Sequence, residues 1–303
     1  MLAHAADLIG REVDLGPVEV TPERIRRYAD AIGDRALAAG PCDVAPLGFA
    51  LAIRGGPRPE VMLADGTVSV HGGHAITVHR PLTAPGVYGV RARVTEVFEK
   101  SGRSGQLTVI ARRADIRGPD GDLVVTVDDQ QIVRWRSPAA ASPSPAAGAV
   151  RETEEWEESL PSSTAQAGAS DLEVGESIGP TRRLAPSAQG IARFAQMLGW
   201  TEPLFLEQNA ARTMGFANVI VPGPLQSALL EAMLRDRLPA WRLQRLQLVF
   251  RVSVAAGEPI SMSAIVVERH EREARSTVIC DLALENGGGD RTALGTAELC
   301  RIR

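Results

Sequence analysis

Two stretches of this 303-residue chain resemble each other at a separation of 166 residues. Residues 25–34 read IRRYADAIGD and residues 191–200 read IARFAQMLGW, with Ile, Arg, an aromatic residue, Ala and Gly in the same places. An internal repeat on this scale indicates that one fold occurs twice. The two copies are expected to pack on each other as a pair of identical subunits would. The length also suits two domains of about 130 to 150 residues each.

The composition is that of a globular protein without a strong charge. Hydrophobic residues make up 44% and charged residues 23%, and the net charge is −4. Nucleic acids and anionic membranes call for a clustered positive surface, so neither is an expected partner. Cys42, Cys280 and Cys300 are far apart and form no CxxC pair, which argues against a disulfide framework and a zinc site. No signal peptide or membrane span is evident at the start, and we expect a cytoplasmic protein without cofactor or metal.

A low-complexity segment divides the chain. It begins as SPAAASPSP and continues into the acidic run ETEEWEE, a composition that cannot bury enough apolar surface to fold alone. The sequence therefore predicts an N-terminal domain at 1–136, a flexible linker at 137–171 and a C-terminal domain at 172–303.

In both halves the pattern predicts helices first and strands afterwards. In the first half, Thr21-Pro22-Glu23 is typical of a helix N-terminus, and that helix is expected to end near Ile32. A buried helix is expected at 44–53 and strands at 67–70, 75–79, 89–99, 106–116 and 123–133. The second half predicts helices at 187–198 and 224–237, then strands near 243–253, 259–268, 275–285 and 293–302. An apolar helix followed by a curved antiparallel sheet predicts an α+β double hotdog, with each sheet wrapped around a central helix.

Several of these segments resemble the MaoC-like hydratase/dehydratase family, in particular two-domain acyl dehydratases whose N-terminal domain is itself dehydratase-like. In the first half the resemblance rests on YADAIGD at 28–34, AP at 45–46, VHG at 70–72, HRPL at 79–82 and VTEVFEKSGRSG at 94–105. In the second half it rests on RFA at 193–195, GF at 215–216 and IVPGPLQ at 220–226. The segments cover most of both halves and exclude the linker.

The resemblance implies an acid–base dyad and a site for a thioester carbonyl. In that family an Asp or Asn and a His follow the first helix, and a His-Gly step before the central helix polarises the carbonyl. Carried onto the second half, the dyad positions hold Trp200 and Phe205, and Pro222 replaces the His of the His-Gly step. In the first half Asp34 holds the acid position, but 35–39 contains no His. The resemblance thus implies a dyad that is incomplete in both copies.

The candidate catalytic residues are Asp34 and Glu202. Asp34 is the acid retained at a family position, although an Asp after a glycine at a helix end is also a common turn former. Glu202 could supply a displaced carboxylate with a raised pKa in an apolar cleft, or could simply be a solvated loop residue.

The candidate substrate-binding residues are Trp200, Phe205, Phe216, Gly223 and His74. The three aromatic residues could form the wall of a ligand site or part of the core. Gly223 could present the positive end of a helix dipole to a carbonyl oxygen, or could merely open a packed helix. His74 belongs to a histidine group, with His71 and His79, whose spacing favours pocket-lining or core hydrogen bonding over metal binding.

Loss of the dyad favours an enzyme that acts by shape. We expect a cyclase or isomerase working on a polyketide-like or fatty-acyl-derived substrate, because cyclisation can be accelerated by holding near-attack geometry. The alternatives are an (R)-3-hydroxyacyl-thioester dehydratase or enoyl hydratase with relocated catalytic residues, and a non-catalytic partner subunit of a dehydratase. The expected ligand is a small acyl molecule, free or thioester-linked to coenzyme A or a carrier protein, and the double hotdog could form a homo-oligomer.

Overall fold

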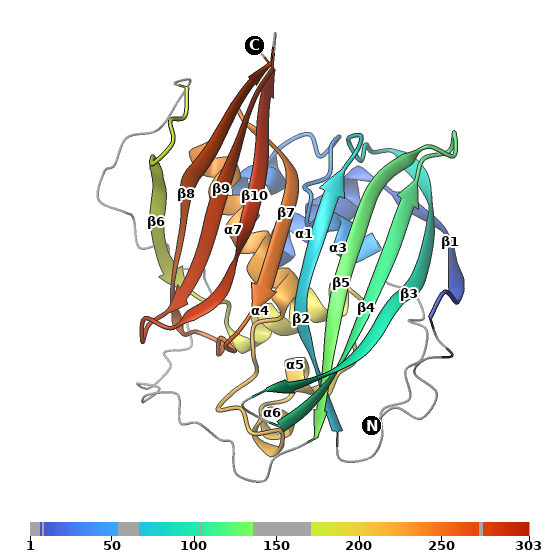
Figure 1. The fold of residues 1–303 in the computed structure, drawn as a ribbon, viewed down its shortest axis with the longest axis vertical. Helices are drawn as coiled ribbons and strands as arrows, with labels where there is room; N and C mark the ends of the chain where they lie inside the picture. Colours follow the sequence, from blue (N-terminus) through green and yellow to red (C-terminus); the bar gives the residue numbers. More distant parts are fainter. Residues whose placement is uncertain are drawn as a thin grey trace.

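The computed structural model describes residues 7, 9–53, 67–102, 105–135, 171–272 and 275–302. Within these residues, ten strands form one antiparallel sheet that curves around the helices on its concave face (Figure 1). The strands are β1 (Glu12–Val20), β2 (Thr67–Val78), β3 (Gly86–Gly102), β4 (Gly105–Arg117), β5 (Leu123–Trp135), β6 (Ser177–Leu184), β7 (Arg242–Phe250), β8 (Pro259–Arg272), β9 (Arg275–Asn286) and β10 (Arg291–Ile302). The architecture is the α+β arrangement that the sequence predicts.

The strand order is the same in both halves when it is read outward from the centre. It runs β2, β5, β4, β3, β1 on one side and β7, β10, β9, β8, β6 on the other, and β2 pairs with β7 to join the two halves. A twofold rotation about the β2–β7 junction therefore superimposes one half of the sheet on the other. The repeat seen in the sequence thus corresponds to a pseudo-dimer within one chain.

The repeated helices are α1 (Pro22–Ile32) and α4 (Ala188–Met197), and they begin in the same way. The hydroxyl of Thr21 accepts a hydrogen bond from the backbone of Arg24, and that of Ser187 accepts one from Gly190, each at 3.2 Å. Such caps satisfy amides that have no partner within the helix. The cap predicted from Thr21-Pro22 is confirmed.

The two repeated helices pack against each other at the pseudo-twofold axis. Tyr28 and Phe194 occupy the same place in the repeat, and their rings meet across the axis with centroids 6.3 Å apart. Both side chains are almost completely buried. The residues that reveal the duplication in the sequence are thus the ones that join the two copies.

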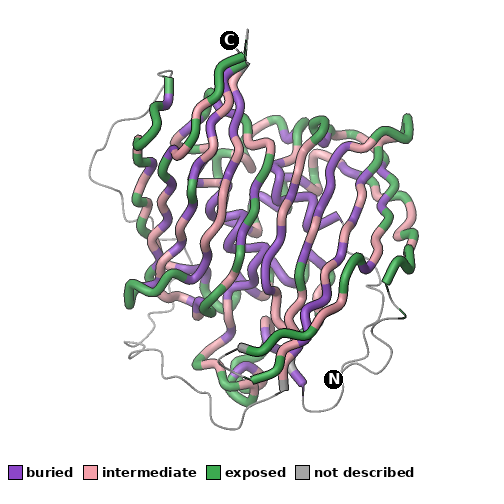
Figure 2. The backbone as a smooth tube through the Cα atoms, in the orientation of Figure 1, coloured by how far each residue is buried: buried purple, intermediate pink, exposed green. Residues whose placement is uncertain are grey.

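The two central helices differ in length within the described residues. In the C-terminal half, α7 (Gly223–Arg237) is buried along most of its length (Figure 2). In the N-terminal half, the helix predicted at 44–53 begins only at Phe49, as α3 (Phe49–Ile53), because Val44 bridges to Thr83 in an extended conformation. The remaining helices are α2 (Arg35–Ala39), α5 (Pro203–Leu206) and α6 (Gln208–Thr213).

Two strands were not predicted. Both β1 and β6 carry a Gly-Pro step, at 16–17 and 179–180, which indicates a turn in sequence. In the structure each step is a β-bulge on a strand at the edge of the sheet, where proline is tolerated because its missing N–H faces no partner strand. The position at the edge is a property of the tertiary structure and not of the local sequence.

Strand β2 is continuous where the sequence predicted two pieces. A β-bulge between His71 and Gly73 joins the pieces. The two glycines in it allow close packing: a Cβ on Gly72 would lie 2.7 Å from the side chain of Ile132, and one on Gly73 would lie 2.6 Å from the carbonyl oxygen of Leu248. The Gly-Gly step therefore lets β2 approach both neighbouring strands and changes which side chains share a face.

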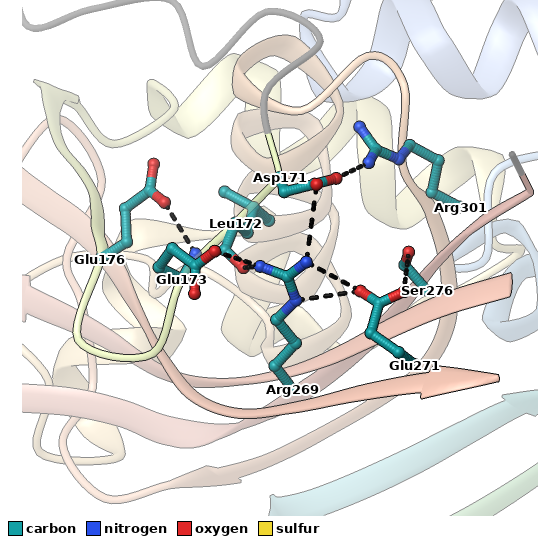
Figure 3. Close-up of polar contacts among 8 residues, drawn as sticks. All are labelled: Asp171, Leu172, Glu173, Glu176, Arg269, Glu271, Ser276 and Arg301. Atoms are coloured by element: carbon teal, nitrogen blue, oxygen red, sulfur yellow. Dashed lines mark hydrogen bonds and ion pairs between the residues drawn. The ribbon is translucent and has the colours of Figure 1, made fainter.

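A cluster of ion pairs holds the chain where it enters the C-terminal half. Arg269 on β8 contacts the carboxylates of Asp171, Glu173 and Glu271 and donates to the carbonyl oxygen of Leu172 at 3.2 Å (Figure 3). Arg301 on β10 also pairs with Asp171. The predicted linker at 137–171 lies, apart from its last residue, outside the described residues, so the domain boundaries stay a prediction.

Candidate functional site

The N-terminus of α7 faces strand β2 of the other half. The helix begins at Gly223, which is buried between the ring of His71 and that of Phe250. A Cβ on Gly223 would lie 2.9 Å from Cδ2 of His71 and 2.5 Å from a ring carbon of Phe250. Glycine is therefore required here by close approach, and the helix begins beside the ring of His71. Proline rather than glycine is the N-cap: Pro222 precedes Gly223, which is the first helical residue.

A chain of hydrogen bonds links two histidines of β2 to α7. Nε2 of His71 lies 2.9 Å from Nδ1 of His74, and Nε2 of His74 lies 2.7 Å from the hydroxyl oxygen of Ser227. The Ser227 hydroxyl donates to the carbonyl oxygen of Gly223 at 3.1 Å. His74 is 4% exposed and Ser227 is fully buried, whereas His71 is half-buried. His71 is thus the outermost member of a polar chain that ends on the first turn of α7.

The histidines belong to a polar row that crosses the concave face of the sheet. His74 on β2 is directly opposite Asp129 on β5, and Asp129 is opposite Arg112 on β4. Side chains directly opposed in antiparallel strands point to the same face. Arg112 and Asp129 form an ion pair at 3.2 Å with side-chain exposures of 8% and 1%. Burial of this much charge needs such pairing, and it places a permanent dipole beside the histidines.

The polar row separates two apolar regions. The main core lies on one side, and a small cluster of Val94, Ile110 and Val133 lies on the other. A continuous apolar core would have been the simpler way to stabilise the sheet, because buried ion pairs contribute little net stability. The polar row interrupts the apolar core beside the start of α7, and this marks the start of α7 as a candidate site.

The pseudo-twofold rotation places aliphatic residues where the first half has histidines. Gly73 pairs with Val249 and Thr77 pairs with Arg245, so the rotation exchanges Gly73 with Arg245 and Thr77 with Val249. By the same rotation the counterpart of His71 is Leu243, and that of His74 is Leu246. Both copies also carry a bulge there, opposite 130–131 on β5 and 298–299 on β10. Only one of the two symmetry-related positions therefore carries groups that can transfer a proton.

The equivalent helix start in the N-terminal half is occupied by a side chain from α7. Residues ahead of α3 and α7 form matching bridges, Val44 with Thr83 and Ile220 with Ala255, so Leu47 corresponds to Gly223. The carboxylate of Glu231 accepts hydrogen bonds from the backbone of Leu47 at 2.6 Å and of Gly48 at 2.7 Å. The amides that could bind a ligand oxygen in this half already bind Glu231.

Asp34 belongs to the same group of contacts that fills the helix start of the N-terminal half. It caps α2 by accepting from the backbone of Leu37 at 2.8 Å and pairs with Arg235 of α7. Arg235 also lies 3.6 Å from Glu231. Twelve residues of helix separate Gly223 from Arg235, about 18 Å along the axis. Asp34 and Gly223 therefore lie at opposite ends of α7, and one small substrate group cannot contact both.

Burial dominates the electrostatics of this closed end. It raises the pKa of the Glu231 carboxyl, and the charge of Arg235 and the hydrogen bonds from Gly48 and Leu47 oppose that rise. Burial also raises the pKa of the Tyr28 hydroxyl well above its usual value, and the charge of Glu231 adds to the rise. Neither group is placed to exchange protons with a ligand.

Two of the three predicted aromatic residues, Trp200 and Phe205, have their rings in contact. The centroids of Trp200 and Phe205 are 5.4 Å apart, and Trp200 meets Phe194 edge-on at 6.5 Å. Phe216 is half-buried and packs against the main core together with Trp200 and Phe205. Glu202 is exposed and occupies the N-cap position of α5, between the two aromatic positions.

The sequence identified His74 and Gly223 but not the arrangement that connects them. On a regular strand, residues three apart point to opposite faces, so the spacing of His71 and His74 does not by itself predict that their rings meet. The bulge at Gly72 brings them to one face. Ser227, Asp129 and Arg112 had no signal in the sequence, because a buried serine, aspartate or arginine cannot be recognised before its partners are known.

Comparison with known proteins places the chain among dehydratase-like hotdog proteins. A sequence model described as the FAS1-like dehydratase domain region matches residues 7–127. The UPF0336 protein of Thermobifida fusca (strain YX) is 32% identical over 155 residues, which cover 46% of this chain and 99% of that protein.

Three solved structures show the same fold over nearly the whole chain. A MaoC-like dehydratase has a TM-score of 0.74 at 18% identity and covers 99% of both chains. A putative MaoC domain protein dehydratase from Chloroflexus aurantiacus J-10-fl has a TM-score of 0.70 at 13% identity, covering 97% of this chain and 95% of that one. A Mycobacterium tuberculosis protein described as having a double hotdog fold has a TM-score of 0.65 at 14% identity, covering 98% and 97%. The predicted α+β double hotdog is confirmed.

Proposed function

Because the chain belongs to the MaoC-like, dehydratase-type hotdog family, we propose that it is a lyase that binds an acyl thioester at the N-terminus of α7. His71 is the group that transfers the proton of the elimination or addition. The observation that carries the proposal is the position of His71, whose ring edge lies against the first residue of a helix that is buried at that end. This is the hydratase or dehydratase with relocated catalytic residues that the sequence left as an alternative.

The helix start supplies the electrostatic part of the chemistry. A thioester carbonyl that accepts a hydrogen bond from the Gly223 amide becomes more polarised, because the positive end of the helix dipole favours negative charge there. The proton on Cα becomes more acidic in consequence. The equivalent amides of Leu47 and Gly48 are bound to Glu231, so we assign one acyl site to each chain.

The histidine supplies the proton transfer. In a dehydration, the imidazole of His71 takes the proton from Cα, the electron pair of that C–H bond forms the Cα=Cβ double bond, and the Cβ–O bond breaks. The proton then passes from the imidazolium to the departing hydroxide, which leaves as water. Hydration of an enoyl thioester is the reverse of these steps, and neither direction needs a cofactor.

A shape-directed cyclase or isomerase is the second candidate. The contact of Trp200 with Phe205 favours it, because an aromatic wall can hold a flexible polyketide-like or fatty-acyl chain in a reactive conformation. In that case Gly223 would polarise a carbonyl, and Asp34 or Glu202 would act as the acid. The separation of Asp34 from Gly223 along α7 favours Glu202 of the two.

The experiment is hydration of short and longer trans-2-enoyl coenzyme A thioesters by the purified full chain, followed by loss of the enoyl absorbance. We expect His71→Ala to lower turnover by about 10²-fold or more, the usual contribution of a general acid–base residue. His79→Ala is the matched control, because His79 is an exposed histidine directly after the same strand, and its Nε2 lies 3.0 Å from the hydroxyl oxygen of Thr126. It should leave turnover within about 2-fold of the native protein.

Three results would contradict this proposal. Native turnover in a folded His71→Ala protein would exclude His71 as the proton-transfer group. No hydration at all, together with cyclisation of a polyene thioester that is lost in Trp200→Ala, would favour the second candidate. A protein inactive with both substrate types that raises the activity of a separate dehydratase would be a partner subunit.

A further inference from the structure

We propose that Gln226 is a specificity-determining residue whose side-chain oxygen recognises the hydroxyl group of a 3-hydroxyacyl thioester. The proposal deepens the proposed function and rests on it, because the ligand is the acyl thioester assigned to the N-terminus of α7. Gln226 lies in the first turn of α7, three residues after Gly223, and is 3% exposed.

The side chain of Gln226 turns back toward the start of the helix. Its Nε2 donates to the carbonyl oxygen of Val221 at 3.2 Å, and Val221 lies two residues before Gly223. Helical side chains lean toward the N-terminus of their helix, so the amide group of Gln226 covers the turn that Gly223 begins. Residues three and four apart share a helix face, so Gln226 and Ser227 lie on either side of Gly223 at the face that meets the histidines.

The contact with Val221 decides how the amide group of Gln226 is oriented. A carbonyl oxygen only accepts hydrogen bonds, so the atom that faces it must be the NH2 nitrogen of Gln226 and not the side-chain oxygen. Oε1 of Gln226 therefore points away from Val221. This oxygen is buried, and no group in the described part of the chain donates a hydrogen bond to it.

A buried acceptor of this kind indicates a ligand that supplies the hydrogen. Buried polar atoms without a hydrogen-bond partner are uncommon in folded proteins and cost free energy. Oε1 of Gln226 lies at the helix start to which we assign the thioester carbonyl, and the thioester group itself has no N–H or O–H. The two donors near that group are the hydroxyl on Cβ and the amide N–H of a pantetheine arm. The hydroxyl is nearer to the carbonyl along the molecule, which favours it.

The side-chain oxygen of Gln226 accepts a hydrogen bond but exchanges no proton. In the hydration, the water donates one hydrogen to Oε1 of Gln226 and transfers the other to His71, while its oxygen forms the bond to Cβ. The imidazolium of His71 then protonates Cα, which takes up the electron pair of the double bond. The hydrogen held by Gln226 stays on the product as the hydrogen of the 3-hydroxyl group. Gln226 thus selects the acyl chain, and His71 transfers the proton.

The test compares two ligands that differ only in the hydroxyl group. Dissociation constants of butyryl-CoA and of each enantiomer of 3-hydroxybutyryl-CoA are measured by calorimetry with the full chain. All proteins carry His71→Ala, which prevents dehydration during the titration. We expect one hydroxyacyl enantiomer to bind about 10-fold or more tightly than butyryl-CoA, because the ligand without the hydroxyl leaves the buried oxygen unpaired. With Gln226→Met, which has nearly the same size, the two ligands should bind within about 2-fold of each other.

Gln247→Met is the matched control, because it makes the same change at an exposed glutamine of β7, and it should keep the preference. Each protein is compared with itself, so a general loss of binding or stability cancels from the ratio. If Gln226→Met does not fold, Gln226→Leu gives the same comparison with a shorter side chain.

Three results would overturn the proposal. The first is equal binding of the ligands to the protein that retains Gln226, and the second is a preference that survives in Gln226→Met. The third is an equal weakening of all ligands in Gln226→Met, which would assign the oxygen to the amide of the pantetheine arm. Hydration activity without a hydroxyl preference would leave the lyase and overturn this role of Gln226. A hydroxyl preference without hydration activity would contradict the lyase and support recognition by Gln226.

Discussion

Replacement of Glu231 by alanine should destabilise the junction between the two halves. Glu231 is 5% exposed, lies on α7, and accepts hydrogen bonds from the backbone of Leu47 and of Gly48. Alanine removes the acceptor and leaves two amides of the other half without a partner in a buried position. It also removes one of the two carboxylates near Arg235, which keeps its ion pair with Asp34.

The expected loss follows from the two amides. A buried hydrogen-bond donor left without an acceptor costs about 1–3 kcal/mol, so two cost about 2–6 kcal/mol. Removal of a buried carboxylate returns part of its desolvation cost, which argues for the middle of that range, about 4 kcal/mol. At about 2–4 °C per kcal/mol for a chain of this size class, Tm should fall by about 8–16 °C.

The assay is thermal and urea unfolding of the full chain, with Glu231→Gln as the matched control. Glutamine has nearly the same shape and keeps one oxygen acceptor, so it should lose only about half as much, about 1–3 kcal/mol. If the free energy of unfolding of the alanine variant lies within about 1 kcal/mol of the native value, Glu231 does not occupy the amides of Leu47 and Gly48 as described. A glutamine variant less stable than the alanine variant would lead to the same conclusion.

The pH dependence gives a second measurement of the same contact. Burial raises the pKa of the Glu231 carboxyl, so the folded protein binds that proton more tightly than the unfolded chain does. Its contribution to the free energy of unfolding is therefore fully present below the ordinary glutamate pKa and is lost as the pH rises through the raised value. Glu231→Gln should remove this part of the slope, which urea titrations across that window would measure.

Two further predictions concern other parts of the chain. Burial raises the pKa of the Cys280 thiol to about 12, so Cys280 should stay unmodified when the native protein is alkylated near pH 8 and should be labelled after denaturation. Mass spectrometry would measure the labelling. Fast labelling of the native protein would contradict the position of Cys280 in the core. The composition of 137–170 predicts that a protease cuts there first. The two fragments should stay associated in gel filtration, because β2 pairs with β7 and α1 packs on α4. Fragments that separate freely would contradict the pseudo-dimer.

The sequence by itself determined the duplication and most of the elements. The repeat around Tyr28 and Phe194 is visible in the residues because the two side chains pack on each other across the axis and are constrained together. The caps at Thr21 and Ser187 were predictable because they depend on residues within one helical turn. Local periodicity likewise placed the long strands and α7, since each has a buried face that the pattern records.

The tertiary structure alone decided where a site can exist. Histidines three residues apart share a face only because a bulge at Gly72 shifts the alternation of β2, and that bulge depends on how closely the neighbouring strands approach. Glu231 reaches the amides of Leu47 only because two residues separated by 184 positions meet at the junction of the halves. Contacts of this kind follow from packing of distant elements, which no local pattern records.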